Sequence, residues 1–394
     1  MDYGRFVGVL CLIVAGCDDS APPGDDGGGD ICEGLSGELL TSAQLDQAAP
    51  SDLVLDPTSD AGEFYVSYSG VDCVSRHSAD GQELWRLPGD ACDQLAVDSA
   101  GDLLLAGLDN TNDGSRITKR NSDGEELWTH ILSEELASEL RLDVAVDPDD
   151  NVLVMGSDPF SDEGGWVTKL DASGAEQWTV VLGGRTVEKN PPSVATSANG
   201  DVTVGYALDG EDADGLVRVS RYDAAGQEQW SVDFPGPSAR LDAMDTDDTG
   251  RVIVGLYVYD EGGPRRSLAL LSAQGTLEWT RSTDDTPSQL TSAVAFAPCD
   301  TIVMAGGADP ASDASELGRQ LWVTKLDSDG TPLWANFTDG PLDTNHFSDG
   351  IRAIAVDAAG QITAAGVVTV EINPSQGEEF PVNDTDLWFG RFDA

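Results

Sequence analysis

Residues 169–178 read KLDASGAEQW, and close copies occupy residues 119–128 (KRNSDGEELW), 221–230 (RYDAAGQEQW) and 325–334 (KLDSDGTPLW). Each copy joins two short runs through a glycine turn, because Asp, Asn, Ser and Gly favour tight reversals of the chain. The tryptophans of six such G-x-x-x-W motifs recur every 43 to 55 residues, which indicates a protein built from structural repeats. The spacing G-x-x-x-W occurs at Gly81/Trp85, Gly124/Trp128, Gly174/Trp178, Gly226/Trp230, Gly275/Trp279 and Gly330/Trp334.

A second motif precedes the first and completes a pattern of four strands. It reads LAVDSAGDLLLAG at 95–107, VAVDPDDNVLVMG at 144–156 and IAVDAAGQITAAG at 354–366. Each unit thus contains four short apolar or alternating runs separated by turn residues, and these runs show no convincing helical period. Four strands repeated every 40–50 residues or so predict a β-propeller. We predict an all-β, seven-bladed propeller with units that begin near residues 53, 94, 143, 193, 241, 293 and 352.

The seventh unit contains only three of the four runs. It extends through AIAVDAAGQITAAG and then DLWFGRFDA (386–394). The segment LSGELLTSAQ (35–44) is similar to the outer half of the other units but has no tryptophan. We therefore predict that this N-terminal strand closes the last blade, which would remove an exposed sheet edge. The propeller domain is expected to span residues 35–394.

These units resemble the PQQ-like and seven-bladed propeller repeats of bacterial envelope lipoproteins. The resemblance covers roughly residues 35–394 and depends on the D-x-x-G and G-x-x-x-W spacings. It implies a propeller in the cell envelope, but this fold carries many functions, so it does not identify a ligand.

The first 34 residues have the composition of an export signal and a tether. MDYGRFVGVLCLIVAG carries Arg5 and a short apolar run, too short to span a bilayer, and it is followed by Cys17 in a sequence that resembles the bacterial lipobox. We predict a lipoprotein signal peptide at residues 1–16, lipidation of Cys17, and an acidic, Gly/Pro-rich tether at 17–34. The protein is then exported and lipid-anchored to the bacterial cell membrane or the outer membrane.

The chain is strongly acidic, with 71 acidic and 21 basic residues and a formal net charge of −50. Nucleic acids and anionic headgroups bind proteins through Lys and Arg, so this balance argues against nucleic acid as a partner. We expect a monomer whose acidic surface keeps it soluble.

Four cysteines beyond Cys11 and Cys17 are disulfide candidates in an exported protein. Cys73 starts a third strand and Cys92 lies in the next connection, so we predict that they pair. Cys32 and Cys299 map to the opposite face on the last and sixth blades and form a second candidate pair.

Three residue types recur at fixed places in the units and are interpreted as structural. The tryptophans are expected to pack between neighbouring blades. A basic residue lies five positions before the turn glycine at Arg76, Lys119, Lys169, Arg221 and Lys325, with Arg391 equivalent and Leu270 as the exception. An Asp ends the first strand at Asp56, Asp98, Asp147, Asp245 and Asp357, with Thr196 and Ala297 as exceptions. Repetition around the ring favours a repeated ion pair or turn bond over one active site.

Function is expected where the units differ in length. The D-x-x-G turns are short and share one face, whereas the longest connections share the other face and belong to the last two units. These are residues 307–320, 338–350 and 368–386. The candidate binding residues in them are Asp309, Asp313, Glu316, Asp343, His346, Glu378, Glu379 and Asp384.

Sequence motifs of catalysis and metal binding are scarce. The three histidines fall at unrelated positions, and no G-x-S-x-G, H-E-x-x-H, Walker or dinucleotide motif occurs. Asp109 and Asp113 in DNTNDG are weak calcium candidates without the glutamate of an EF-hand. No cofactor is predicted, although calcium remains an option.

We interpret the chain as a non-enzymatic, lipid-anchored binding or scaffolding module for a protein, peptide or glycan of the envelope. One alternative is a quinoprotein-like cofactor enzyme, but such enzymes commonly have eight blades and adjacent cysteines. The other alternative is an envelope-assembly lipoprotein, similar to the eight-bladed one that acts in outer-membrane protein insertion. The seven units predicted here depart from that blade count as well.

Overall fold

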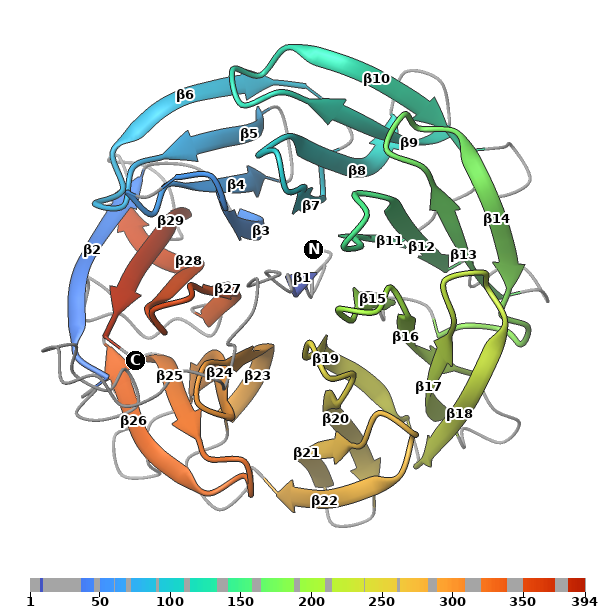
Figure 1. Cartoon of the computed structure of the whole chain (residues 1–394). Helices are drawn as coiled ribbons and strands as arrows, with labels where there is room; N and C mark the ends of the chain where they lie inside the picture. Colours follow the sequence, from blue (N-terminus) through green and yellow to red (C-terminus); the bar gives the residue numbers. More distant parts are fainter. Residues whose placement is uncertain are drawn as a thin grey trace, which may run out of the picture.

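Seven antiparallel sheets surround a central axis as the blades of a propeller, which confirms the predicted fold class (Figure 1). The computed structural model describes residues 8–9, 37–45, 50–59, 61–68, 72–89, 92–109, 114–132, 141–157, 164–187, 192–209, 215–236, 238–260, 263–282, 289–308, 320–338, 350–372 and 382–393.

The seven blades match the seven predicted units. Blade 1 contains β3 (Pro50–Leu55), β4 (Phe64–Tyr68), β5 (Asp72–His77) and β6 (Glu83–Pro88). Blade 2 contains β7 (Gln94–Val97), β8 (Leu103–Asp109), β9 (Gly114–Arg120) and β10 (Glu126–Ile131). Blade 3 contains β11 (Arg141–Val146), β12 (Val152–Ser157), β13 (Gly165–Leu170) and β14 (Glu176–Val181). Blade 4 contains β15 (Ser193–Thr196), β16 (Val202–Leu208), β17 (Leu216–Tyr222) and β18 (Glu228–Pro235).

The remaining blades complete the ring. Blade 5 contains β19 (Arg240–Thr246), β20 (Val252–Asp260), β21 (Gly263–Leu271) and β22 (Leu277–Ser282). Blade 6 contains β23 (Gln289–Ala297), β24 (Thr301–Ala308), β25 (Gln320–Leu326) and β26 (Pro332–Thr338). Blade 7 contains β27 (Gly350–Val356), β28 (Ile362–Ile372), β29 (Val382–Phe392) and the N-terminal β2 (Leu39–Leu45).

The ring is closed by the N-terminal strand, as predicted. β2 pairs antiparallel with β29, with Leu39 opposite Phe392 and Leu45 opposite Leu387. A further strand of two residues, β1 (Gly8–Val9), lies parallel to β27 near the centre of the ring (Figure 1). The rest of the predicted signal peptide and tether, including Cys17, lies outside the described residues, and these domain boundaries and the lipid anchor stay predictions.

The hydrophobic core lies between blades. Seven clusters of buried apolar residues occur, and each joins side chains of two neighbouring blades. The middle strands are buried on both faces, as in β12, whereas the outer β14 has exposed and half-buried positions. Each blade therefore completes the core of its neighbour, which explains why the repeats require a closed ring.

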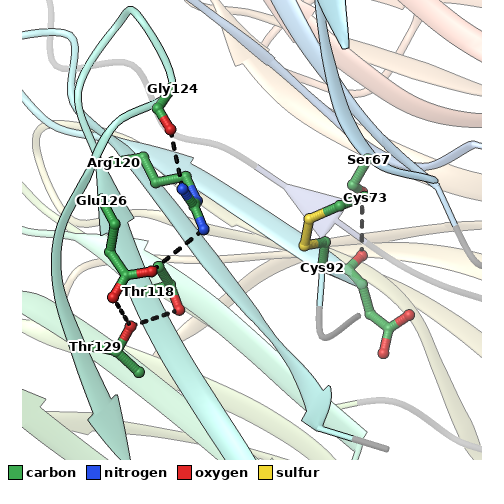
Figure 2. Close-up of a disulfide and its surroundings, with 9 residues drawn as sticks. Ser67, Cys73, Cys92, Thr118, Arg120, Gly124, Glu126 and Thr129 are labelled. Atoms are coloured by element: carbon green, nitrogen blue, oxygen red, sulfur yellow. Dashed lines mark hydrogen bonds and ion pairs between the residues drawn. A yellow bond between two sulfur atoms is a disulfide. The ribbon is translucent and has the colours of Figure 1, made fainter. Parts of the chain in front are cut away.

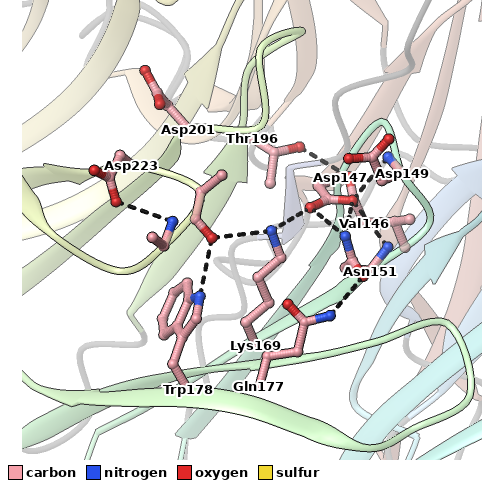
Figure 3. A network of polar contacts seen from close by, with 12 residues as sticks. Val146, Asp147, Asp149, Asn151, Lys169, Gln177, Trp178, Thr196, Asp201 and Asp223 are labelled. Atoms are coloured by element: carbon pink, nitrogen blue, oxygen red, sulfur yellow. Dashed lines mark hydrogen bonds and ion pairs between the residues drawn. The ribbon is translucent and has the colours of Figure 1, made fainter.

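The repeated tryptophan binds the next blade, which confirms its predicted structural role. Trp178 of blade 3 donates its indole N–H to the carbonyl of Ala224 in the outer turn of blade 4, at 3.1 Å (Figure 3). Trp128, Trp230 and Trp279 make equivalent bonds of 3.1, 2.9 and 2.8 Å. The indole also covers the turn glycine: a Cβ on Gly226, whose φ is +78°, would lie 3.0 Å from Trp178.

The predicted ion pair forms in four blades. Lys169 Nζ lies 2.7 Å from Asp147 Oδ2 and 3.5 Å from the Ala224 carbonyl (Figure 3), so it also reaches the next blade. The other pairs are Arg76–Asp56 at 2.6 Å, Lys119–Asp98 at 2.5 Å and Arg391–Asp357 at 3.2 Å.

One member of the predicted aspartate series, Asp245, and one of its predicted exceptions, Thr196, are wrong. In blade 5 the turn begins at Asp247, whose N–H donates to the Arg251 carbonyl, so Asp245 lies two residues too early. In blade 4 the turn residue is Ser197 and not Thr196. The sequence DAMDTDDTG offers several aspartates, and only the position of Gly250 distinguishes them.

Asp245 instead belongs to a set of three buried carboxylates that join adjacent inner strands. It accepts the N–H of Thr246 at 2.7 Å and that of Phe296 in blade 6 at 2.8 Å. Asp52 joins blade 1 to Leu95 of blade 2, and Asp143 joins blade 3 to Val194 of blade 4. Burial raises the pKa of Asp52 and of Asp245 to about 7 and that of Asp143 well above its usual range.

Candidate functional site

Most of the predicted binding-face residues lie outside the described part of the chain. These are Asp309, Asp313, Glu316, Asp343, His346, Glu378 and Glu379. Asp384 was expected in a loop, but its backbone lies in β29 opposite Val370. The connection predicted at 368–386 is shorter because β28 extends to Ile372 and β29 begins at Val382. The binding face of blades 6 and 7 therefore stays a prediction.

The calcium prediction falls on residues that the structure describes only in part, and it stays a prediction. The backbone of Asp109 ends strand β8, and Asp113 lies outside the described residues. Within the described ranges, no group of three His, Cys, Asp or Glu side chains could hold a metal ion.

The cysteines connect distant parts of a unit. Cys73 and Cys92 form a disulfide with a Cα–Cα distance of 5.2 Å, as the repeat geometry predicts (Figure 2). Cys299 is also disulfide-bonded, whereas Cys32 lies outside the described residues.

A pocket of about 80 Å³ opens beside the Cys73–Cys92 disulfide, between blades 1 and 2. Its apolar wall consists of Leu87, Pro88, Leu105 and the disulfide. Its polar wall consists of three side chains on alternate positions of β9, namely Arg116, Thr118 and Arg120. Two arginine side chains beside one small pocket are unusual for a chain with 21 basic and 71 acidic residues.

The pocket lies where blade 2 has arginine at two positions, of which the first, Arg116, recurs in blade 4 as Arg218 and the second, Arg120, is arginine in no other blade. Arg120 follows the repeated basic residue, where the other blades have the buried residues His77, Leu170, Tyr222, Leu271, Leu326 and Phe392. Arg116 stands where three blades have a buried tryptophan: Trp166, Trp322 and Trp388. The cluster between blades 1 and 2 accordingly has eight buried apolar residues, against ten to thirteen in the other six. Comparison of the aligned repeats would have shown both substitutions.

Arg120 is held in place by its own blade (Figure 2). It donates to the carbonyl of Gly124 at 2.9 Å and to Glu126 Oε2 at 3.3 Å. The other oxygen of Glu126 accepts a hydrogen bond from Thr129, whose hydroxyl contacts that of Thr118 at 3.1 Å. The Glu126 side chain is 51% exposed, so its ion pair with Arg120 contributes little to stability and another carboxylate could take its place.

A second non-repeating feature lies on the outer circumference. The residue before the outer tryptophan is a leucine in blades 1, 2 and 6, and Leu40 occupies the same place in blade 7. Leu333, Leu40, Leu84 and Leu127 are 47% to 55% exposed and lie on consecutive outer strands, β26, β2, β6 and β10 (Figure 1). Blades 3, 4 and 5 have Gln177, Gln229 and Glu278 instead. We call the four leucines the leucine arc; Leu277 and Val181 are exposed outside it.

One serine–histidine pair occurs in blade 1, but it is buried. His77 Nε2 lies 2.6 Å from the Ser75 hydroxyl, which contacts the Tyr68 hydroxyl at 2.5 Å. Ser75 and His77 are 0% exposed, and burial lowers the pKa of His77. A nucleophile that no substrate can reach has a structural role, here the satisfaction of buried polar groups.

Comparison with known protein families shows which family the chain belongs to. A family model described as outer membrane protein assembly factor BamB matches residues 113–309, which is half of the chain. The chain belongs to this family. The BamB family match begins at β9 and covers blades 3, 4 and 5 completely. No curated protein matches the chain.

Solved structures similar to this BamB family member have low identities and TM-scores below 0.5. A putative gluconolactonase is 18% identical over 67% of this chain and 88% of its own, with a TM-score of 0.42. The gluconolactonase of Xanthomonas campestris is 14% identical over 91% of this chain and 100% of its own (TM-score 0.43). Prolyl oligopeptidase B of Galerina marginata is 12% identical over 82% of this chain and 46% of its own (TM-score 0.46).

These structures correct one expectation. We expected a non-enzymatic protein because no catalytic motif occurs in the sequence, but propellers that match this chain include enzymes. The absence of a motif therefore does not exclude an enzymatic activity for this fold. At these identities the likeness shows the fold alone.

No helix among the residues that the structure describes is long and apolar enough to cross a membrane.

Proposed function

We propose that the protein is a lipid-anchored scaffold of the cell envelope that holds a protein partner through the leucine arc. The arc is the observation that carries this proposal. Four leucines that are about half exposed occupy one repeat position on consecutive blades, whereas blades 3, 4 and 5 have Gln or Glu there. Exposed apolar side chains that gather on one side of a protein mark interaction surfaces.

Membership of this family supports another envelope protein as the partner. The name of the family describes assembly of outer membrane proteins, a process that requires contacts between envelope proteins. The seven blades distinguish this chain from the eight-bladed assembly lipoprotein considered above. The anchor at Cys17 would leave a tether of about 20 residues before β2, the strand of blade 7 that carries Leu40 and lies within the arc.

The charge of the protein restricts how the partner binds. With a net charge of −50, contact with an acidic surface is unfavourable, so the partner surface is apolar at its centre and neutral or basic at its edge. Salt is then expected to weaken the edge contacts only, because apolar burial is not screened by ions.

Site-specific photocrosslinking in intact cells tests the proposal with a matched control in the same chain. A photoreactive residue replaces Leu40, Leu84, Leu127 or Leu333 in one series and Gln177, Gln229 or Glu278 in the other. We expect the first series to give one discrete crosslinked envelope protein and the second series to give none. Equal crosslinking from both series would reject the arc as the interface. Cys17→Ser, followed by membrane fractionation, tests the anchor separately.

A further inference from the structure

We propose that the pocket between blades 1 and 2 is a carboxylate-binding site for the free C-terminus of a peptide chain. The inference deepens the proposed function by naming a ligand group, and it rests on that function only for the partner being a protein. The site lies between β6 and β9 and does not include the leucine arc.

The chemistry of the pocket fits an anion with a small apolar substituent. Arg116 and Arg120 are four residues apart on β9, so both side chains leave the same face of the strand, where a ligand carboxylate would have to compete with the partners these arginines have in the protein. Guanidinium groups match the geometry of a carboxylate and bind it through paired N–H donors. Thr118 adds a hydroxyl between them, while Leu87, Pro88 and the disulfide supply an apolar wall.

The volume admits a small ligand group. A pocket of about 80 Å³ is well above the roughly 10–15 Å³ that one water requires, so a carboxylate with a few carbon atoms can enter it. The last residue of a peptide with a small side chain satisfies this requirement, and the rest of the chain would leave through the open side.

The protein already has a carboxylate at this place. Glu126 Oε2 contacts Arg120 at 3.3 Å from a half-exposed position, so an incoming carboxylate would replace a weak internal ligand. Displacement of Glu126 has a small energetic cost because exposed ion pairs contribute little to stability. Without Glu126 the pocket is expected to bind carboxylates more tightly.

The presence of arginine at position 120, where other blades have buried residues, supports a ligand-binding role for the pocket. Leucine occupies the position of Arg120 in three blades, and it is fully or almost fully buried there. Arginine at this position leaves a void that apolar residues fill elsewhere, and a void between blades lowers stability. A ligand that occupies the pocket would restore the missing contacts.

Fluorescence anisotropy on the purified protein tests the proposal. The probes are a fluorescein-labelled tetrapeptide that ends in alanine with a free carboxylate and the same peptide as its C-terminal amide. We expect the free acid to bind at least about tenfold more tightly than the amide, because the charge-assisted bonds require a carboxylate. Equal binding of acid and amide would overturn the proposal.

Variants separate the pocket from general charge effects. Arg116→Gln/Arg120→Gln is expected to reduce binding about tenfold or more, whereas Glu126→Gln should increase it several-fold. Arg218→Gln is the matched control, because Arg218 has the place of Arg116 on blade 4 and pairs with Asp233 there. Equal loss of binding in Arg218→Gln would contradict the assignment.

Arg120→Leu excludes a failure of folding. Leucine at this position reproduces blades 3, 5 and 6, so the melting temperature should stay the same or rise while binding is lost. Retained binding in this variant would overturn the proposal. Acetate and propionate serve as competitors: displacement of the peptide at concentrations equal to those of the unlabelled peptide would assign the pocket to small organic acids instead. Peptide binding uses purified protein, so its failure is distinct from a failure of crosslinking through the leucine arc in cells.

Discussion

The ammonium group of Lys169 lies 2.7 Å from Asp147 Oδ2, and the two side chains are 4% and 1% exposed. Because the same ammonium reaches the Ala224 carbonyl, one buried charge pair connects two blades. The pair thus couples the stability of a blade to that of its neighbour.

Lys169→Met should lower the free energy of unfolding by about 3 kcal/mol, because it leaves Asp147 buried without its counter-charge. Urea unfolding followed by tryptophan fluorescence measures the change. Arg185→Met is the control: Arg185 and Asp209 are 3.9 Å apart and more than half exposed, so a loss below about 0.5 kcal/mol is expected. The double variant Asp147→Asn/Lys169→Met should recover part of the loss. If Lys169→Met and Arg185→Met lowered the free energy of unfolding by similar amounts, the buried pair would stabilise the protein no more than the exposed pair does.

Removal of the Cys73–Cys92 disulfide should cost about 3 kcal/mol, the loop-closure value for its sequence separation of 19 residues. The double variant Cys73→Ala/Cys92→Ala keeps the disulfide of Cys299, so its melting temperature isolates the first bond. Dithiothreitol should then destabilise the wild type more than the variant. An equal effect on both proteins would mean that the stabilising disulfide is the other one.

The protein should be less stable at neutral pH than at mildly acidic pH. The pKa values of Asp52 and Asp245 are about 7 in the folded protein and about 3.8 when unfolded, so the folded state binds more protons between these values. The free energy of unfolding therefore falls as pH rises from about 4 to 7, by up to about 1.4 kcal/mol per pH unit for each carboxyl.

The histidine of blade 1 acts in the opposite direction. Because burial lowers the pKa of His77, the stability that its neutral form contributes is lost as pH falls below about 6.5. The three buried carboxyls outnumber this single histidine, so their effect on the free energy of unfolding should dominate. Urea unfolding at pH 5.0, 6.0 and 7.0 measures the slope, and Asp52→Ala should make it shallower even where the protein is less stable. A stability that rises steadily over this range would show that the buried carboxyls are ionised in the folded state.

Deletion of residues 37–45 should leave the edge of β29 unpaired and cause aggregation, because a free strand edge pairs with other chains. A synthetic peptide of residues 37–45 added during refolding should restore monomeric protein in size-exclusion chromatography. A peptide with Leu39 and Leu45 replaced by Asp is the control, since both residues pair with apolar positions of β29. Monomeric behaviour of the deleted protein without peptide would contradict the role of β2.

The architecture could be predicted because each unit repeats the same physical constraints. A turn glycine at Gly226 and a tryptophan at Trp230 define one hairpin, and their recurrence defines the ring. Asp245 was misassigned because several aspartates adjoin one turn, although the D-x-x-G spacing to Gly250 already identifies Asp247 as the residue that starts it.

The candidate site was harder to predict for a related reason. Arg116 and Arg120 are ordinary on a single strand, and they become informative only when set against the residues that fill the same space in other blades. Likewise, Leu40 and Leu333 lie almost 300 residues apart in the sequence, and only the closed ring places them on neighbouring strands.

The pairing of Leu39 with Phe392 has a consequence for biogenesis. A chain that emerges from its N-terminus presents β2 (Leu39–Leu45) before the seven-blade sequence, and its partner strand β29 (Val382–Phe392) follows only after six blades have emerged. Until then β2 has no sheet to join, and blade 7 can form only after the other six have been synthesised. The time needed to produce the chain between β2 and β29 thus sets a lower limit on the time in which the ring can close, and a factor that shields nascent β2 would act throughout that interval.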